Sequence, residues 1–340
     1  MKRIVTFGEI MLRLAPEGYY RFFQNDKMQA TFGGGEANVA VALAQYGMNA
    51  AFVTKLPDHA IGQAAINSLR YFGVDTDDIA LGGERIGVYY LEKGASQRAS
   101  VCIYDRNHSS IQTASEDDFD WDDIFTGADW FHFTGITPAL SDNLAKICKV
   151  ACIKAKEKGL TVSCDTNYRS KLWSLDKASS VMKELMQHVD VCLTNPGDAK
   201  DLFGIVSDKP DYSFSSPNND GAISIAKKLH ERFDFSKVAM TLRSNKSASD
   251  NDFAGLLYDG SDCRYSKEYH MHIVDRVGGG DSFGSGLIYA LLSEMDTQSA
   301  IDFAVAASVL KHSIEGDFNR VTVEEVKKLA SSDGSGRIQR

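Results

Sequence analysis

The strongest constraint on the fold is a repeated alternation of short apolar segments with longer helix-like segments. Apolar runs of strand length occupy residues 4–7, 51–54, 130–133, 161–165, 189–193 and 238–242. Segments with helical periodicity occupy residues 37–46, 61–72 and 141–158. Strands that alternate with helices of this length are typical of a mostly parallel sheet with helices on both faces. The alternation therefore predicts an α/β fold, and 340 residues suffice for one large domain with a smaller appendage.

Two segments interrupt this alternation. Residues 12–32 are rich in aromatic and polar residues without a helical stripe, and residues 87–111 have two apolar runs around a polar turn, as in a β-hairpin. Together they predict a small antiparallel sheet suited to act as a lid over a cleft. The alternative is an edge extension of the central sheet. We expect the α/β domain to span residues 1–330, and the Ser- and Gly-rich residues 331–340 to be a flexible tail.

Composition excludes several classes of partner. The net charge of −9 without clusters of Lys and Arg argues against nucleic-acid binding, which needs a basic face. No apolar run approaches the roughly 18 residues that a membrane helix needs, and the N-terminus lacks the pattern of a secretion signal. The six cysteines contain no C-x-x-C pair and are expected to be reduced thiols. These features predict a cytoplasmic protein without a membrane or nucleic-acid partner.

A glycine-rich segment at residues 275–286 carries the clearest chemistry, and an apolar helix-like segment follows it. The glycines Gly278, Gly279 and Gly280 let backbone N–H groups converge at the positive end of that helix, which makes an anion site. The pattern matches neither the P-loop nor the dinucleotide-binding motif. Asp281 follows the glycines, and it either caps the helix or points its carboxylate at a substrate hydroxyl.

A second glycine cluster, at residues 33–35, also precedes a helix of small residues. Glycines permit a ligand to approach closely, and the amide of Asn38 can both donate to and accept from a hydroxyl. Taken alone, this cluster is equally consistent with ordinary turn chemistry.

The two clusters together resemble the two motifs of the ribokinase-like (PfkB-type) carbohydrate kinases. The pattern Gly-Gly-x-x-Asn at residues 34–38 and the pattern Asp-x-x-Gly-x-Gly-Asp at residues 275–281 have the order and separation of that family. The resemblance covers about residues 2–329. It implies a ribokinase-like three-layer fold with a small β-sheet lid, ATP and Mg²⁺ as cofactors, and a monovalent cation such as K⁺ bound near Asp275. It also implies that Asp281 is the general base.

Further segments resemble the 2-keto-3-deoxygluconate kinases within that family: residues 89, 104–106, 131–136, 165–173 and 316–317. In that subfamily the matching positions imply contacts to the sugar acid from Gly34, Asn38, Tyr89, Tyr104, Arg106, Ile136, Arg169 and Asp317. A sugar carboxylate needs a planar two-pronged donor, which arginine supplies better than lysine. Without this motif context, Arg106 and Arg169 would be taken as solvated surface charges.

The nucleotide side departs from the family pattern in two places. The resemblance implies nucleotide contacts from Asn195, Thr241, Arg243, Gly278 and Gly280. The family motif N-x-x-E, which helps to organise magnesium, has an aspartate here, Asp198. The family pattern Thr-x-Gly after the nucleotide-side strand has Arg243 in place of glycine, and this arginine would act on the phosphates electrostatically.

The predicted reaction is ATP-dependent phosphorylation of 2-keto-3-deoxy-D-gluconate at its terminal hydroxyl, to 2-keto-3-deoxy-6-phosphogluconate. The resemblance also implies a homo-oligomer, because lid sheets in this family often pair between subunits. The alternative functions are those of a fructokinase, a ribokinase, a 2-keto-3-deoxygalactonate kinase, or a non-catalytic sugar-acid sensor. A nicotinamide dehydrogenase is disfavoured, because the first strand is not followed by a dinucleotide-binding motif.

Overall fold

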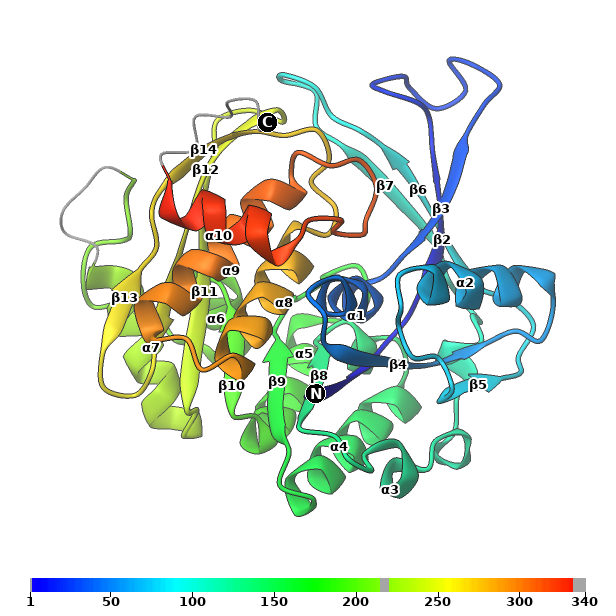
Figure 1. Cartoon of the computed structure of the whole chain (residues 1–340), viewed down its shortest axis with the longest axis horizontal. Helices are drawn as coiled ribbons and strands as arrows, with labels where there is room; N and C mark the ends of the chain where they lie inside the picture. The colour runs from blue at the N-terminus through cyan, green and yellow to red at the C-terminus, as the bar shows by residue number, and fades with distance from the viewer. Residues whose placement is uncertain (1, 215–219, 333–340) are drawn as a thin grey trace.

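The computed structural model describes residues 2–214 and 220–332 and has a large mixed sheet at its centre (Figure 1). Over those residues the sheet has ten strands in the order β13-β12-β11-β10-β9-β8-β1-β4-β5, and β14 pairs with β12. The parallel strands are β1 (Arg3–Phe7), β4 (Asn49–Leu56), β5 (Ile79–Leu81), β8 (Trp130–Thr134), β9 (Thr161–Asp165), β10 (Val191–Thr194) and β11 (Lys237–Asn245). The antiparallel strands are β12 (Asp250–Tyr258), β13 (Cys263–Tyr265) and β14 (Tyr269–His272).

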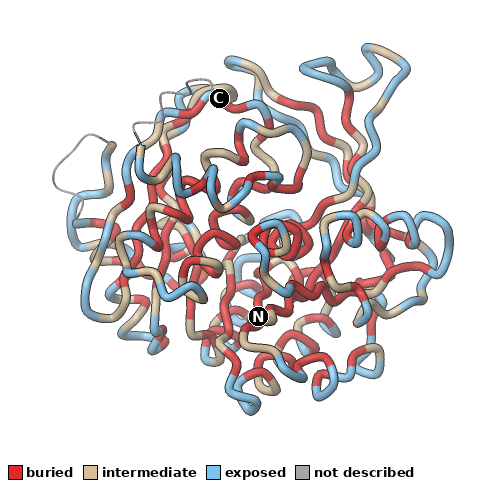
Figure 2. Tube along the Cα trace, viewed as in Figure 1, coloured by how far each residue is buried: buried red, intermediate tan, exposed pale blue. Residues whose placement is uncertain are grey.

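Helices cover both faces of this sheet. One face packs against α1 (Gly35–Gln45), α2 (Ala60–Tyr71), α8 (Gly279–Leu292), α9 (Thr297–Lys311) and α10 (Val323–Ser331). The other face packs against α3 (Trp121–Ile124), α4 (Asp142–Glu157), α5 (Leu175–Leu185), α6 (Pro196–Phe203) and α7 (Asp220–Phe233). Successive side chains of β1 alternate between the two cores: Ile4 lies in the first, Val5 and Phe7 in the second. Figure 2 shows the resulting buried centre, with exposure concentrated in the loops.

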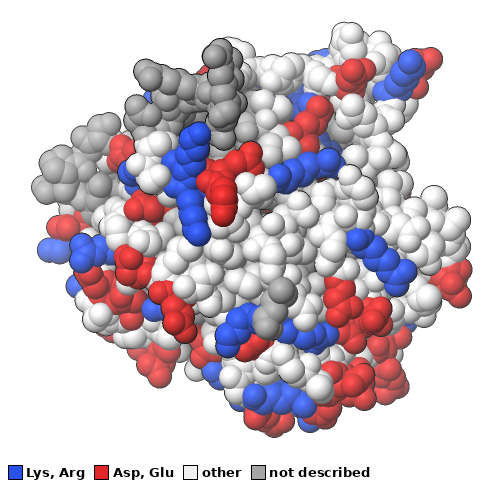
Figure 3. Space-filling view, viewed as in Figure 1, with Lys and Arg blue, Asp and Glu red and all other residues white. Residues whose placement is uncertain are grey.

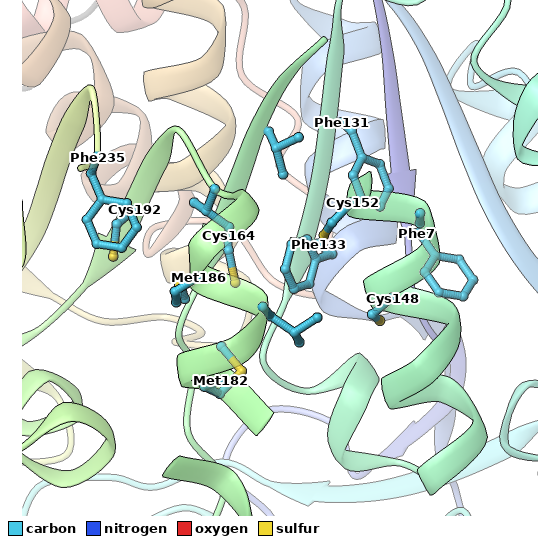
Figure 4. Close-up of a cluster of buried hydrophobic side chains, with 14 of the residues drawn as sticks. Phe7, Phe131, Phe133, Cys148, Cys152, Cys164, Met182, Met186, Cys192 and Phe235 are labelled. Atoms are coloured by element: carbon cyan, nitrogen blue, oxygen red, sulfur yellow. The ribbon is translucent and has the colours of Figure 1, made fainter. Parts of the chain in front are cut away.

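Apolar and sulfur-containing side chains fill the second core (Figure 4). Phe131 and Phe133 from β8 stack with ring centroids 5.8 Å apart, and Cys148 and Cys152 from α4 are fully buried. All six cysteines are free, as the sequence predicts. Burial raises the pKa of the Cys148 thiol well above its ordinary value, so this thiol has the character of a core residue.

A separate smaller sheet rises from the body at the upper right of Figure 1. It contains four strands, in the order β3 (Gln29–Gly33), β2 (Met11–Ala15), β6 (Gly87–Glu92) and β7 (Val101–Asp105). The pairs β2–β3 and β6–β7 are antiparallel, and β2 pairs with β6 in parallel. Short 3₁₀ helices lie at Ile111–Thr113, Glu116–Asp118, Thr137–Ala139 and Met186–His188.

The predicted fold class is confirmed: a mostly parallel central sheet between helices, with a smaller sheet beside it. The sequence did not predict β12 and β13, which together with β14 add an antiparallel edge to the parallel strands. Residues 333–340 of the predicted tail lie outside the described residues. Among the described residues, no helix is long and apolar enough to cross a membrane. On the face drawn in Figure 3, basic and acidic side chains are interspersed.

Candidate active site

The two glycine clusters come together at the carboxyl ends of the parallel strands, where α1 and α8 begin. This edge is where ligands bind in open α/β sheets. Gly278 is the N-cap of α8 and has a φ of 82°. A Cβ there would lie 2.2 Å from the carbonyl oxygen of Asp317, so only glycine fits. A Cβ on Gly279 would lie 2.2 Å from the His312 ring, whereas on Gly280 it would meet no described atom within 4 Å. The loop therefore packs tightly at its first two glycines and opens outward at the third.

Asp281 lies in the first turn of α8 and connects the two clusters. Asn38 Nδ2 donates to Asp281 Oδ2 over 2.6 Å, while Asn38 Oδ1 accepts from the Gly34 N–H over 3.3 Å. The second bond fixes the orientation of the amide, so that its donor faces Asp281. Burial raises the pKa of Asp281 to about 6, and the hydrogen bond from Asn38 opposes that rise. A carboxyl group with this pKa can take up a proton near neutral pH, as a general base must.

The glycines at residues 33–35 allow other parts of the chain to approach closely. A Cβ on Gly34 would lie 1.9 Å from the Glu9 carbonyl oxygen, a clash that no rotamer relieves. A Cβ on Gly35 would lie 3.7 Å from Asp281 Oδ1. The absent side chains thus leave the reactive face of Asp281 open on the side of α1.

Asp317, a predicted sugar contact, is the centre of a buried ionic network. Arg13 Nη1 donates to Asp317 Oδ1 over 2.7 Å, and Arg13 Nη2 donates to Asp275 Oδ2 over 2.5 Å. The Tyr89 hydroxyl donates to Asp317 Oδ2 over 2.6 Å. Burial raises the pKa of Asp317, and the charge of Arg13 opposes the rise. The structure brings Tyr89 and Asp317 together, and Arg13, which joins Asp317 to Asp275, was missed. A lone arginine on a strand gives no sequence signal for this role.

The two arginines predicted to hold a carboxylate differ in their surroundings. Arg106 is buried and forms an ion pair with Glu9, and its guanidinium lies 5.1 Å from the centre of the Tyr104 ring. Arg169 is exposed, and no described residue forms a side-chain hydrogen bond or ion pair with it. The positive charge of Arg169 nevertheless opposes the burial-induced rise in the pKa of Tyr104, Asp165 and Asp281. The charge of Arg169 is therefore available to an incoming anion, whereas that of Arg106 is already balanced.

Three carboxylates approach one another near Arg169. Burial raises the pKa of Asp165, at the end of β9, to about 8, and the negative charges of Asp198 and Asp281 add to that rise. Asp198 Oδ2 accepts from the backbone N–H of Tyr168 over 3.1 Å. Asp165 was not among the predicted site residues, although it ends a strand at the ligand-binding edge. The predicted residue Ile136 lies nearby at the end of β8, where its N–H donates to the Thr134 hydroxyl over 3.1 Å.

A cavity of about 1010 Å³ lies beside the first turn of α8, where Gly280 lines it. The residues that line it include four of the five predicted nucleotide contacts: Asn195, Thr241, Arg243 and Gly280. Gly278 is not among its lining residues. Tyr212 and Phe214 also line this cavity and offer apolar surface to a planar ring.

Arg243, which lines this cavity, is anchored by His312. His312 Nδ1 donates to the Ser308 carbonyl oxygen over 2.6 Å, which leaves Nε2 to accept from Arg243 Nη2 over 2.9 Å. Burial lowers the pKa of His312 to about 3, so the imidazole is neutral and suited to accept this bond. Burial and the charge of Arg276 lower the pKa of Arg243 to about 10, so the guanidinium stays charged near neutral pH. The arginine that replaces the family glycine is thus a fixed cation beside Gly279.

Glu36 is a further buried acid that sequence reasoning missed. Its Oε1 accepts from the Thr134 N–H over 2.9 Å, from the Thr134 hydroxyl over 2.8 Å and from the Thr137 hydroxyl over 2.7 Å. Burial raises the pKa of Glu36 to about 7. These bonds hold the start of α1 against the end of β8 and so fix the position of Asn38.

Comparison with known proteins gives the family. A family model described as pfkB family carbohydrate kinase matches residues 1–319, and the chain belongs to this family. The chain is 32% identical to a 2-dehydro-3-deoxygalactonokinase of Haloferax volcanii over 337 residues, 98% of each chain. It is 26% identical to a 2-dehydro-3-deoxygluconokinase of Thermoproteus tenax, covering 93% of this chain and 90% of the relative.

Solved structures agree with this family. The crystal structure of a 2-dehydro-3-deoxygluconokinase from Thermotoga maritima superposes with a TM-score of 0.94 at 48% identity, covering 98% of this chain and 100% of that one. Another neighbour, a ribokinase-like protein from E. coli solved with ATP and Mg²⁺, has a TM-score of 0.79 at 19% identity and covers 96% of this chain and 98% of that one. The second likeness concerns the fold.

Proposed function

We propose that the protein transfers the γ-phosphoryl group of ATP to the terminal hydroxyl of 2-keto-3-deoxy-D-gluconate, giving the 6-phosphate and ADP. The hydroxyl oxygen forms a bond to the γ-phosphorus, the bond from that phosphorus to the β–γ bridging oxygen breaks, and Asp281 takes the hydroxyl proton. The observation that carries the proposal is the carboxylate of Asp281, held by Asn38 at the junction of two glycine-led helices, with its pKa raised to about 6. A group that only capped α8 would need neither this partner nor this pKa.

The phosphates lie against the outward-facing part of the glycine loop. Gly280 lines the large cavity, and the first N–H groups of α8 point out from a helix end that carries partial positive charge. Arg243 lines the same cavity and adds a full positive charge beside the loop. Such preorganised donors stabilise the charge that spreads over a transferring phosphoryl group.

The sugar acid lies on the side of Asp281 that faces α1. Its hydroxyl approaches Asp281 and Asn38, and its carboxylate lies against Arg169, which has no side-chain partner among the described residues. A guanidinium binds a carboxylate through two parallel hydrogen bonds. Neutral sugars have no group that would use this arginine, and its availability therefore favours an acid.

Two carboxylates of the site, those of Asp165 and Asp198, fit Mg²⁺. Asp165 and Asp198 lie close enough for their charges to interact, and the charge of Asp198 adds to the rise that burial causes in the pKa of Asp165. Among the described residues there is no group of three or more metal-ligating side chains. Mg²⁺ characteristically binds through one or two carboxylates, water and the phosphates of a nucleotide. Asp198 and Asp165 would hold the ion with the nucleotide, where it neutralises phosphate charge.

The smaller sheet is proposed to close over the sugar and to pair between subunits. It contributes Tyr89 and Tyr104 to the site, and its outer strand β7 exposes Val101 and Ile103. An exposed apolar edge strand favours pairing with another strand. A homo-oligomer in light scattering, which an added charge at Ile103 dissociates, would support this assembly, whereas a monomeric native chain would refute it.

The 4-epimer, 2-keto-3-deoxygalactonate, is the second candidate substrate. It is favoured by the 32% identical relative from Haloferax volcanii, which is named for that substrate. The two acids share the carboxylate and the terminal hydroxyl, so the arginine and aspartate arguments apply equally to both.

The test is ADP formation by the purified chain with ATP, Mg²⁺ and, separately, each acid, fructose and ribose. We expect kcat/KM to be highest for 2-keto-3-deoxygluconate and at least about 100-fold lower for the neutral sugars, the scale of one lost charge-assisted contact. Preference for the epimer would select the second candidate. Equal or better turnover of fructose or ribose would contradict a sugar-acid kinase, and binding of the acid without ADP formation would indicate a sensor.

A further inference from the structure

A fully buried ammonium lies beneath the glycine loop. Lys311, the last residue of α9, has no exposed surface, and its Nζ donates to the carbonyl oxygen of Ile314 over 3.1 Å. Its side chain lies against the loop, because a Cβ on Gly278 would come within 3.2 Å of Lys311 Cε. A buried ammonium is costly unless negative charges nearby compensate it. The mechanism above makes no use of this residue.

Negative charges do surround Lys311. The carboxylates of Asp275 and Asp317 both interact favourably with it, and so does that of Asp281. Burial lowers the pKa of Lys311, and these three carboxylates oppose that lowering. With Arg13, which bridges Asp275 and Asp317, the network contains two cations and three carboxylates.

This network does not fit the monovalent cation that the family resemblance implies near Asp275. Asp275 Oδ1 accepts from the Val277 N–H over 3.1 Å, and Oδ2 accepts from Arg13 Nη2 over 2.5 Å and the Gly316 N–H over 3.1 Å. A K⁺ ion needs several oxygen ligands, but both carboxylate oxygens of Asp275 already accept hydrogen bonds. A third positive charge would also repel the two that Arg13 and Lys311 supply.

We propose that the ammonium of Lys311 is a built-in replacement for a bound monovalent cation, so that the glycine loop is held and polarised without K⁺. The lysine acts as a positioning residue. It fixes Gly278 against the Asp317 backbone, and it places a positive charge on the protein side of the loop whose outer face receives the phosphates. The catalytic part of this inference rests on the proposed kinase activity. The expectation that the stability of the fold does not depend on K⁺ holds without that activity.

The first experiment compares the wild-type chain in KCl, NaCl and tetramethylammonium chloride at equal ionic strength. We expect the melting temperature and kcat to agree among the three salts, with kcat constant within about twofold. A melting temperature or kcat that rises saturably with K⁺, by about tenfold for kcat, would overturn the proposal. The melting temperature does not depend on turnover, so this result stands even if the substrate assignment fails.

The second experiment removes the ammonium in two ways. Lys311→Ala leaves space for an ion, whereas Lys311→Met fills most of that space without charge. We expect both variants to lower kcat by about 10-fold or more, the scale for a lost electrostatic donor, with less change in the KM of the sugar. In Lys311→Ala, K⁺ or methylammonium should restore part of kcat and raise the melting temperature, whereas Lys311→Met should not respond.

Lys93 provides the matched control, because it is also buried but forms its ion pair with Glu315. Lys93→Ala should remain insensitive to the choice of monovalent ion. The proposal is overturned if Lys311→Ala keeps its kcat, or if it folds and loses kcat without responding to K⁺ or methylammonium. If neither Lys311 variant folds, the comparison of salts on the wild-type chain decides the question.

Discussion

Asn38 donates a hydrogen bond of 2.6 Å to Asp281, and this contact joins residues that lie 243 positions apart in the sequence. Its energetic effect on Asp281 opposes that of burial: burial raises the pKa of the carboxyl group, and the hydrogen bond lowers it. The balance leaves a pKa of about 6, so that most of the group is ionised at neutral pH. A residue of α1 thus helps to set the charge state of the proposed base, which lies on α8.

The pH dependence of the reaction follows from this pair. A base must be deprotonated to act, so kcat/KM should fall as pH decreases through about 6. Asn38→Ala removes a bond that stabilises the carboxylate, and the acidic limb should therefore move to higher pH. The measurement is kcat/KM against pH for both proteins. An unchanged limb in Asn38→Ala would mean that another group controls it.

The outward position of Gly280 can be tested against the packed position of Gly279. A methyl group on Gly280 meets no described atom, so Gly280→Ala should keep the melting temperature but weaken ATP binding and turnover. Gly279→Ala places a methyl group against His312, which Ser308 and Arg243 hold in place, and should lower the stability by about 1–3 kcal/mol. Calorimetric binding and thermal unfolding separate the two effects. Normal ATP binding by Gly280→Ala would remove the loop from the phosphate site.

Arg169 and Arg106 should respond differently to truncation. Arg169→Ala leaves a bound sugar carboxylate uncompensated, which costs roughly 2–5 kcal/mol. It should therefore lower kcat/KM for the sugar acid by roughly 30-fold to several thousand-fold, with little change for neutral sugars. Arg169→Lys should recover only part, because an ammonium cannot supply the planar fork.

Arg106→Ala strands the buried carboxylate of Glu9 and should lower the melting temperature of the free protein. If Arg169→Ala reduced turnover of fructose and the acid equally, its role would be structural or directed to phosphate. Steady-state kinetics on both sugars, with unfolding curves for both variants, provide the comparison.

Glu36 makes the stability depend on pH. Its pKa in the folded protein, about 7, lies above the ordinary value of 4.5, so folding favours the protonated form. The stabilising contribution is complete below pH 4.5 and is lost as pH rises through about 7. Glu36→Gln removes this titration, and its melting temperature should fall less between pH 5 and pH 8 than that of the wild type. Parallel curves for the two proteins would contradict the raised pKa.

The sequence predicts the fold class because strand and helix lengths alternate locally, and it predicts the two loops because glycine clusters before helices have few explanations. It does not predict the strands β12 and β13 or their antiparallel pairing, which depends on tertiary packing at the sheet edge. It also misses Arg13, Lys311 and Glu36. Each is a single charged residue whose role depends on partners far away in the chain, such as Asp275 for Arg13, and no local pattern marks such a residue.

The central claim is that Asp281 accepts the proton of a sugar-acid hydroxyl during phosphoryl transfer from ATP. Its most direct test is single-turnover phosphorylation of the preferred sugar acid by the wild type and by Asp281→Asn, with sugar affinity measured by calorimetry. We expect a rate about 10²–10⁴-fold lower in Asp281→Asn, the scale of a lost general base, with the sugar still bound and the fold retained. A rate near that of the wild type in the folded variant would contradict the account and leave Asp281 as a residue that only caps α8.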